Sequence, residues 1–283
     1  MTDIIEDLIG VVVLYNNTIE ESITLTSINR NLEIIKKKID IIVYDNNNYS
    51  EIKNGTIFLH GQLKIHYFHD PTNPGVSKAY NFAANYANNL KKNWLLLLDQ
   101  DTDFPVDAID NYILSIKQNP EIKLFAPILK DSTGAIISPC RYIFKRGFPL
   151  KRVTTGITSL QNISPLNSGI LIYLTTFFLS GGYNELIKLD FSDFQFIERF
   201  KKINTYCYII NVECLHNFSN SETNTSKLNN RFIFYCDGAK KIKKSSTIDR
   251  FTYFMVVLLR ATRLVYRTKK SIFFKTFIFH YLR

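Results

Sequence analysis

The sequence has no run of apolar residues long enough to cross a membrane. The longest such run in its C-terminal part covers residues 251–259, whereas a spanning helix needs about 20 residues. The N-terminal segment MTDIIEDL is acidic, so it lacks the basic and apolar regions of a secretory signal peptide. We therefore expect a cytoplasmic protein.

Cysteine is scarce, and its spacing argues against a redox pair and a zinc site. The four residues Cys140, Cys207, Cys214 and Cys236 form no CxxC pair and have no histidines at zinc-binding spacing. Because cytosolic proteins seldom keep disulfides, we expect four reduced thiols.

Glycine-rich phosphate-binding loops are also missing. No Gly-x-Gly-x-x-Gly follows a predicted strand, which argues against an NAD-dependent enzyme. The first predicted strand is followed by Tyr15-Asn16-Asn17, where a nucleotidyltransferase would want a basic, glycine-rich loop. A nucleotidyltransferase with a similar metal site remains an alternative, although this loop disfavours it.

Positive charge is confined to the C-terminal part. The net charge is +10, yet residues 240–283 hold 12 of the 35 Lys and Arg residues and a single acidic residue, Asp249. The rest of the chain is close to neutral, so we expect no nucleic-acid partner for the globular body. A basic, aromatic tail instead favours an anionic membrane surface. A non-catalytic module that binds lipid or nucleic acid through this tail is a second alternative.

Apolar runs and helical periodicity alternate along the first hundred residues. This alternation predicts an α/β fold with a parallel sheet covered on both faces. The predicted strands are residues 9–15, 40–44, 64–68, 94–98, 124–129, 170–174 and 205–212. The predicted helices are residues 19–35, 75–90, 105–118 and 190–202, with loops or a small hairpin over 130–165.

Polar residues gather where the predicted strands end. Tyr15-Asn16, Asp45-Asn46 and Asp99-Gln100-Asp101 each follow a strand, and ligands of parallel sheets bind at the carboxyl ends of the strands. Asp99 and Asp101 can converge on one divalent cation that bridges the phosphates of a nucleotide. The alternative is a polar cap on the strand without a metal.

Seven motifs occur in an ordered series between about residues 9 and 216. They are VVVLYNN, VYDNNN, NPGVSKAYNFA, LLLLDQDT, PLNSGILI, SGGYNELIKLDFSDFQFIERF and LHNFS. In this order the chain resembles the family 2 glycosyltransferases, and within them the bacterial rhamnosyltransferase-like group. The resemblance implies a glycosyltransferase-A fold, which is an α/β fold with a Rossmann-like, mostly parallel central sheet. It also implies Mg²⁺ or Mn²⁺ and inverting transfer from a nucleoside-diphosphate sugar. It also implies a surface-glycan or polyprenyl-linked acceptor.

The resemblance also implies roles for individual residues. The nucleotide would contact Leu14, Tyr15, Asp45, Asn73, Gly75, Lys78, Asn81 and Asp99. The metal would be held directly by Asp101, with Asp99 and His216 as further ligands, and the acceptor would contact Asn167, Ser168 and Gly169. The donor is expected to be dTDP-rhamnose, with UDP-linked galactofuranose, glucose or another hexose as alternatives.

Inverting transfer requires a carboxylate that takes the acceptor proton. By resemblance the base is Asp193, which precedes Arg199 by six residues, and Asp190 matches a second acidic position. Capping of the helix N-terminus is the alternative role for these aspartates.

The C-terminal part has the pattern of an amphipathic helix. Arg260, Arg263 and Arg267 share one helical face, and Phe251, Phe254, Leu258 and Val265 can form an apolar face. We expect a catalytic domain over residues 1–230. The helical region over residues 231–283 is expected to bind the inner face of the bacterial plasma membrane. The alternative is that the apolar face packs on the catalytic domain and leaves the arginines in water.

Overall fold

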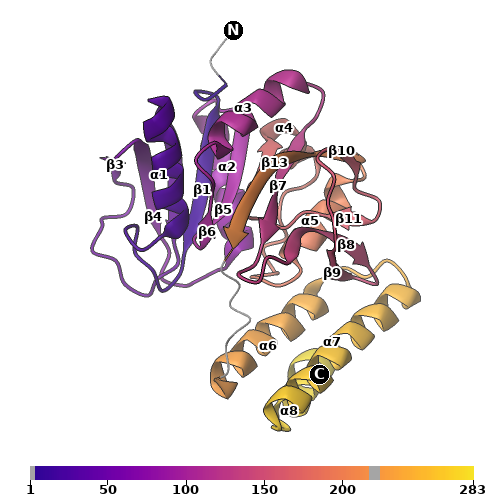
Figure 1. The fold of residues 1–283 in the computed structure, drawn as a ribbon. Coiled ribbons are helices and arrows are strands. Elements are labelled where there is room, and N and C mark those ends of the chain that lie inside the picture. The colour runs from indigo at the N-terminus through magenta and orange to yellow at the C-terminus, as the bar shows by residue number, and fades with distance from the viewer. Residues whose placement is uncertain (1–3, 217–223) are drawn as a thin grey trace.

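Four parallel strands form the centre of one large sheet (Figure 1). In the computed structural model they lie in the order β5 (Trp94–Asp99), β1 (Leu8–Leu14), β2 (Ile39–Asp45) and β4 (Leu63–His69). Most of their side chains are buried, which is why their sequences are continuous apolar runs and do not alternate with polar residues.

The sheet continues beyond β5 through one reversed strand. Strand β12 (Ile170–Tyr173) is antiparallel to both β5 and β7 (Leu124–Lys130), and β13 (Tyr206–His216) is parallel to β7. Strands β13, β7, β5, β1, β2 and β4 therefore run in one direction. The prediction of an α/β fold with a mostly parallel sheet is confirmed.

Shorter strands extend the edges of the sheet. They are β3 (Ile57–His60), β6 (Thr102–Asp103), β8 (Ile136–Ile143), β9 (Arg146–Leu150), β10 (Gly156–Ser159) and β11 (Ile163–Ser164). Strands β8 and β9 form the expected hairpin, but β10 and β11 also pair, with β13 and β8, where loops were expected. Their signal was weak because they are short and rich in Ser and Thr.

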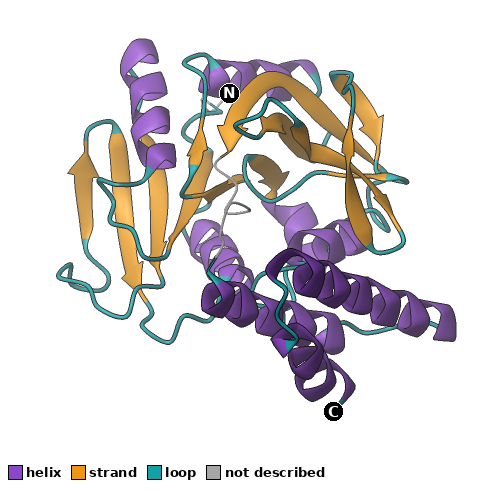
Figure 2. Cartoon of the chain, turned by 60° about the horizontal axis from the view of Figure 1, so that its bottom comes forward, coloured by secondary structure: helices purple, strands orange, loops and turns teal. Residues whose placement is uncertain are grey.

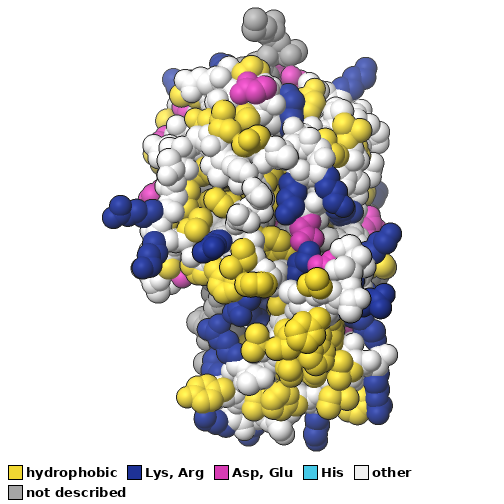
Figure 3. All heavy atoms as spheres, turned by 90° about the vertical axis from the view of Figure 1, so that its right-hand side faces the viewer, with side chains coloured by type: hydrophobic (Ala, Val, Ile, Leu, Met, Phe, Trp, Pro, Cys, Tyr) yellow, Lys and Arg dark blue, Asp and Glu magenta, His cyan; other side chains and the backbone are white. Residues whose placement is uncertain are grey.

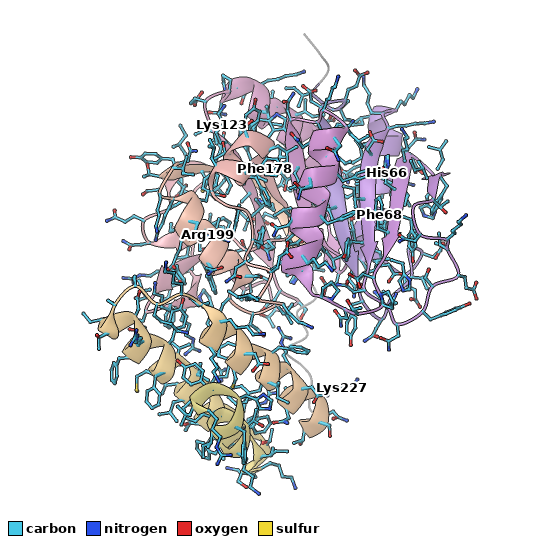
Figure 4. The ribbon with its side chains drawn as sticks, turned by 180° about the vertical axis from the view of Figure 1, so that it is seen from behind. His66, Phe68, Lys123, Phe178, Arg199 and Lys227 are labelled. Atoms are coloured by element: carbon cyan, nitrogen blue, oxygen red, sulfur yellow. The ribbon has the colours of Figure 1, made fainter. Side chains whose placement is uncertain are left out.

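Helices cover both faces of the sheet (Figure 2). Helices α1 (Ile23–Ile35) and α3 (Ala108–Gln118) pack on one face, in the cluster that contains Val12 and Leu98. Apolar residues of α2 (Val76–Asn89), α4 (Leu174–Leu179) and α5 (Ser192–Phe200) pack on the other. His66 and Phe68 of β4 lie beside α2 (Figure 4), with ring centroids 5.4 and 4.9 Å from that of Tyr86.

The C-terminal helices form a separate layer next to the carboxyl ends of the parallel strands (Figures 1 and 2). They are α6 (Thr225–Lys241), α7 (Thr247–Thr268), α8 (Ile272–Thr276) and the π-helix η2 (Phe277–Leu282). Helix α6 crosses the expected boundary between residues 230 and 231. The structure describes residues 4–216 and 224–283, and none of the helices in these ranges is both long and apolar enough to span a bilayer.

The apolar side chains of α7 pack inward. Phe254, Leu258 and Val265 contact a buried cluster shared by α6, α7, α8 and η2, whereas Phe251 is 63% exposed. The same cluster includes Ile187 of the segment that precedes α5. The helical region is thus packed on the part of the chain that forms the sheet, and the expected apolar face is divided between this core and the surface.

Candidate active site

Two carboxylates and one imidazole meet at the carboxyl end of β5. Asp99 is the last residue of β5, Asp101 follows it, and His216 is the last residue of β13. One ligand atom from each lies within 4.8 Å of the others. The pairing of Thr102 in β6 with His216 brings these distant parts of the chain together.

The chemistry of this cluster fits a divalent cation. Carboxylate oxygens suit Mg²⁺ and Mn²⁺, and imidazole is a common partner for transition metals. Burial raises the pKa of Asp101, and the charge of Asp99 adds to this effect while His216 opposes it. A cation would relieve the repulsion between the two carboxylates, so the residues present can hold the expected metal.

Hydroxyl groups orient two of the three ligands, Asp99 and His216. The Thr102 hydroxyl lies 2.7 Å from Nδ1 of His216 and 2.7 Å from the Ser168 hydroxyl, which accepts a bond from the Asp99 amide. The Tyr80 hydroxyl donates to Oδ1 of Asp99 over 3.0 Å. Thr102 and Tyr80 were not predicted. Both stand inside motifs, but only the folded packing shows that they contact the ligands.

Gln100, between the two aspartates, joins the ends of β5 and β1. Its side-chain oxygen accepts from the Tyr15 amide at 2.8 Å, and its side-chain nitrogen donates to the Tyr15 carbonyl at 3.0 Å. Asn47 makes a similar pair of bonds, accepting from the Asn16 amide and donating to the Asn17 carbonyl. These amides fix the loop that carries Tyr15, whose side chain is half exposed.

Asp45 is buried beneath this loop. One carboxylate oxygen accepts from the Tyr67 hydroxyl and the other from the Asn47 amide, so Asp45 holds the end of β2. Leu14 is also buried, and the side-chain oxygen of Asn46 is buried with no hydrogen-bond partner in the described parts of the chain. Contacts of Leu14, Tyr15 and Asp45 with a nucleotide base stay predictions.

The backbone at Lys188 packs against the start of α2. Gly75 has a φ of 92°, and a Cβ there would lie 2.2 Å from the Lys188 carbonyl oxygen. That oxygen accepts from the Val76 amide, which therefore is not directed at a phosphate. Lys78 pairs with Asp70 at 3.2 Å, so its expected phosphate contact would have to replace this ion pair.

Asn81 and Asn73 connect α2 to the segment before α5. Asn81 donates to the Tyr183 carbonyl at 2.9 Å and accepts from the Tyr183 amide at 2.8 Å. The Asn73 carbonyl accepts from Lys188. Arg199 (Figure 4) donates to the carbonyl of Gly182 in the same turn. In the structure these residues position the turn, and their contacts with a nucleotide stay predictions.

The predicted base lies in the first turn of α5. This helix begins at Ser192, so Asp193 is in its first turn, whereas Asp190 lies before it and not within it as expected. Burial raises the pKa of Asp193 to about 7, and the charges of Asp190 and Asp99 add to the rise. Oδ1 of Asp190 lies 4.0 Å from the Arg231 guanidinium of α6.

The segment expected to contact the acceptor is buried. The Asn167 side chain accepts from the Tyr183 hydroxyl at 2.7 Å, and the Gly169 carbonyl accepts from the Tyr112 hydroxyl at 2.5 Å. Ser168 contacts Asp99 as described above. In this structure the segment supports the site, and contact with an acceptor stays a prediction.

Comparisons with known proteins agree with this geometry. Residues 11–162 match the model of the family described as Glycosyl transferase family 2. No curated protein matches the chain significantly. Among solved structures, the chain is similar to residues 1–349 of TarS from S. aureus. The TM-score is 0.52 at 13% identity, over 95% of this chain and 88% of that one.

Two ligand-bound structures are also similar. TarS 1–349 in complex with UDP-GlcNAc gives a TM-score of 0.53 at 14% identity, over 96% of this chain and 78% of that one. The mannosyltransferase PcManGT from Pyrobaculum calidifontis, in complex with GDP-Man and Mn²⁺, gives a TM-score of 0.50 at 12% identity. The match covers 94% of this chain and 73% of that one. At these identities the likeness establishes the fold, which is the expected glycosyltransferase-A fold.

Proposed function

The chain belongs to glycosyl transferase family 2 and is a nucleotide-sugar glycosyltransferase, and on that premise we propose that it transfers the sugar with inversion to a glycan hydroxyl. One observation carries this proposal. Asp99, Asp101 and His216 form a cluster at the carboxyl end of β5, and the charge of Asp99 contributes to the raised pKa of the buried Asp193. A metal site and a proton acceptor near neutral pH are the two parts that inverting transfer needs.

Each part has a distinct task. A bound Mg²⁺ or Mn²⁺ would neutralise charge on the leaving nucleoside diphosphate. Tyr80 and Thr102 keep Asp99 and His216 oriented for that cation. Asp193 accepts the proton of the attacking acceptor hydroxyl, and its burial keeps it basic enough at neutral pH. Asp190 adds negative charge beside Asp193 and so raises its basicity.

The donor is proposed to be dTDP-rhamnose, with a UDP-linked hexose as the alternative. Support for a nucleoside-diphosphate sugar comes from the similar structures, which hold UDP-GlcNAc and GDP-Man. Leu14, Tyr15 and Asp45 would line the base. The start of α2, with Asn73, Gly75, Lys78 and Asn81, would border the nucleotide.

The acceptor is proposed to be a surface glycan or a polyprenyl-linked glycan reached at the inner face of the plasma membrane. In this proposal residues 1–230 are the catalytic domain, with residues 167–169 bordering the acceptor, and residues 231–283 form the membrane-binding region. The basic charge of residues 240–283 and the exposed Phe251 support it.

A donor screen tests the function. Nucleoside diphosphate release is measured for dTDP- and UDP-sugars with Mg²⁺, Mn²⁺ or EDTA, on wild type, Asp101→Ala and Asp103→Ala. Asp103 is the matched control, because it lies two residues after Asp101, at the end of β6, but pairs with Arg30 on the surface. We expect activity only with metal, with loss in Asp101→Ala alone. Donor binding that needs no metal and survives Asp101→Ala would refute the metal assignment. Pyrophosphate release from a nucleoside triphosphate would favour a nucleotidyltransferase instead.

A further inference from the structure

A strongly basic pocket lies between α6 and α7, outside the metal cluster. Its volume is about 450 Å³, and no acidic residue of the described chain lines it. Its six basic residues come from three elements and are Arg146, Lys227, Arg231, Arg260, Arg263 and Arg267. Lys227 marks the start of α6 in Figure 4. The function proposed above assigns no role to this pocket.

The cations that line this pocket repel one another. Arg260, Arg263 and Arg267 share one face of α7 and lie across the pocket from the cations of α6, so like charges repel. Arg260 and Arg263 have no carboxylate partner within the described residues. The Nε atom of Arg260 is buried and has no hydrogen-bond partner there. A buried donor without an acceptor is costly, so an anionic ligand would satisfy both the charge and the donor.

The pocket adjoins the catalytic site through Arg231. This residue lines the pocket and also lies 4.0 Å from Asp190, three residues before the proposed base. An anion bound here would therefore lie on the side of the site where Asp190 and Asp193 are, which is where an acceptor must approach.

The lining indicates what kind of anion fits. One guanidinium group can donate two parallel hydrogen bonds to phosphate oxygens. Several guanidinium groups around one cavity therefore suit a phosphate or a diphosphate. The remaining lining is apolar or aromatic: Leu228, Tyr235, Val256, Leu259 and Leu264. The guanidinium of Arg260 lies over the ring of Tyr235 at 4.9 Å, which holds it in place without using its donors. The pocket thus fits a phosphate group attached to an apolar chain.

We propose that this pocket binds the phosphate or diphosphate of the acceptor and holds its hydroxyl near Asp193. This inference rests on the proposed glycosyltransferase function and adds a separate site for the acceptor. An apolar surface borders the pocket. At about 100° per residue, the exposed side chains of Ile248, Phe251, Leu259 and Tyr266 lie on one side of α7, next to its arginines. Figure 3 shows hydrophobic side chains gathered over the C-terminal helices, with Lys and Arg around them.

Direct binding tests the pocket without relying on turnover. Calorimetry with inorganic pyrophosphate measures the phosphate site alone. Flotation uses phosphatidylcholine vesicles that contain either a polyprenyl diphosphate or phosphatidylglycerol. The amounts are chosen so that both kinds of vesicle carry the same total charge. The pocket variant is Arg260→Gln with Arg263→Gln, and Arg263→Gln alone covers the case in which the double variant folds poorly. The matched control is Lys240→Gln with Lys243→Gln, which removes the same charge from exposed positions outside the lining.

We expect wild type and the control to bind pyrophosphate and the diphosphate vesicles, and the pocket variant to bind both at least about tenfold more weakly. Equal weakening by the pocket and control variants would overturn the proposal. Equal binding to both kinds of charged vesicle would also overturn it, and pyrophosphate binding in that case would assign the pocket to a water-soluble phosphate ester. Nucleotide binding with Mn²⁺, measured on the same preparations, reports separately on the proposed function.

Discussion

At the scale of single residues, Asp193 shows how burial creates chemistry. A carboxyl with a pKa of about 7 is half deprotonated at neutral pH and is a much better proton acceptor than an ordinary aspartate. Its exposed counterpart in the first turn of another helix, Asp110 of α3, serves as a matched control for each Asp193 variant.

The first prediction concerns the pH dependence of transfer. If Asp193 is the base, kcat/KM should rise as pH increases towards about 7 and then level off, because only the deprotonated carboxylate accepts the proton. Asp193→Asn should lower kcat by about 10²- to 10⁴-fold and remove this rise, whereas Asp110→Asn should keep the wild-type profile. Initial rates from pH 5 to 9 measure both effects. Full transfer by Asp193→Asn would show that another group is the base.

The second prediction is a gain of stability in the inactive variant. The pKa of Asp193 rises from 3.8 to about 7 on folding, so the stability that its proton supports is present below pH 3.8 and is lost as pH rises towards 7. At pH 8 the charged carboxylate then lowers the free energy of unfolding by at most about 4 kcal/mol, and an Asn side chain causes no such loss. Urea unfolding at pH 5 and 8 should show Asp193→Asn gaining stability over wild type as pH rises. A pH-independent difference would contradict the raised pKa.

The sequence could predict which residues end the strands, but not which side chains hold those residues in position. Asp99 and Asp101 follow an apolar run, and the structure brings them together with His216 as expected. Thr102 and Tyr80 contact these ligands only because β6 pairs with β13 and α2 packs on β5. No local pattern encodes such pairings, so these supporting residues could not be found before the fold was known.

At the scale of elements, the strands were easier to predict than their directions and ends. The apolar runs located β1, β2, β4 and β5 closely, but nothing in residues 170–174 indicates that β12 runs against its neighbours. The start of α5 was placed too early because Phe191 takes a left-handed φ of 73°, which a helix cannot contain. Its ring packs 4.5 Å from that of Tyr235, a contact with a distant helix.

The third prediction compares two glycines with similar positive φ values. Gly75 and Gly55 have φ values of 92° and 82°, but a Cβ on Gly75 would meet Lys188 whereas none of the described atoms lies within 4 Å at Gly55. Gly55→Ala should lower the free energy of unfolding by about 1 kcal/mol from backbone strain alone. Gly75→Ala should lower it by more, about 3 kcal/mol, because the segment at Lys188 must move. Urea unfolding of both variants gives the difference. Equal costs would mean that the contact at Lys188 gives way easily.

At the scale of the whole molecule, the C-terminal helices support the catalytic site as well as forming a surface. Phe191, two residues before Asp193, packs against Tyr235 of α6 and Tyr253 of α7. Removing residues 245–283 would therefore expose the segment that carries the proposed base, Asp193. Such a deletion would alter activity and membrane binding together, so substitutions on the surface separate the two effects better.

The fourth prediction is that the exposed side of α7 binds membranes. Phe251 and Tyr266 are 63% and 76% exposed on the same side of this helix, in the basic part of the chain. Aromatic side chains beside Lys and Arg favour the surface of an anionic bilayer. Phe251→Ser with Tyr266→Ser should weaken binding to phosphatidylglycerol vesicles by about tenfold or more, since each loses apolar area that the lipid would cover.

Tyr49→Ser with Leu59→Ser provides the control for this variant. These side chains are 74% and 60% exposed but lie in the N-terminal part of the chain, in and near β3. If α7 faces the membrane, only the first pair should change vesicle flotation, and the remaining binding should weaken further with salt. Equal behaviour of the two pairs would mean that the exposed aromatics of α7 do not meet lipid. The basic pocket beside them would then have to receive its ligand from solution.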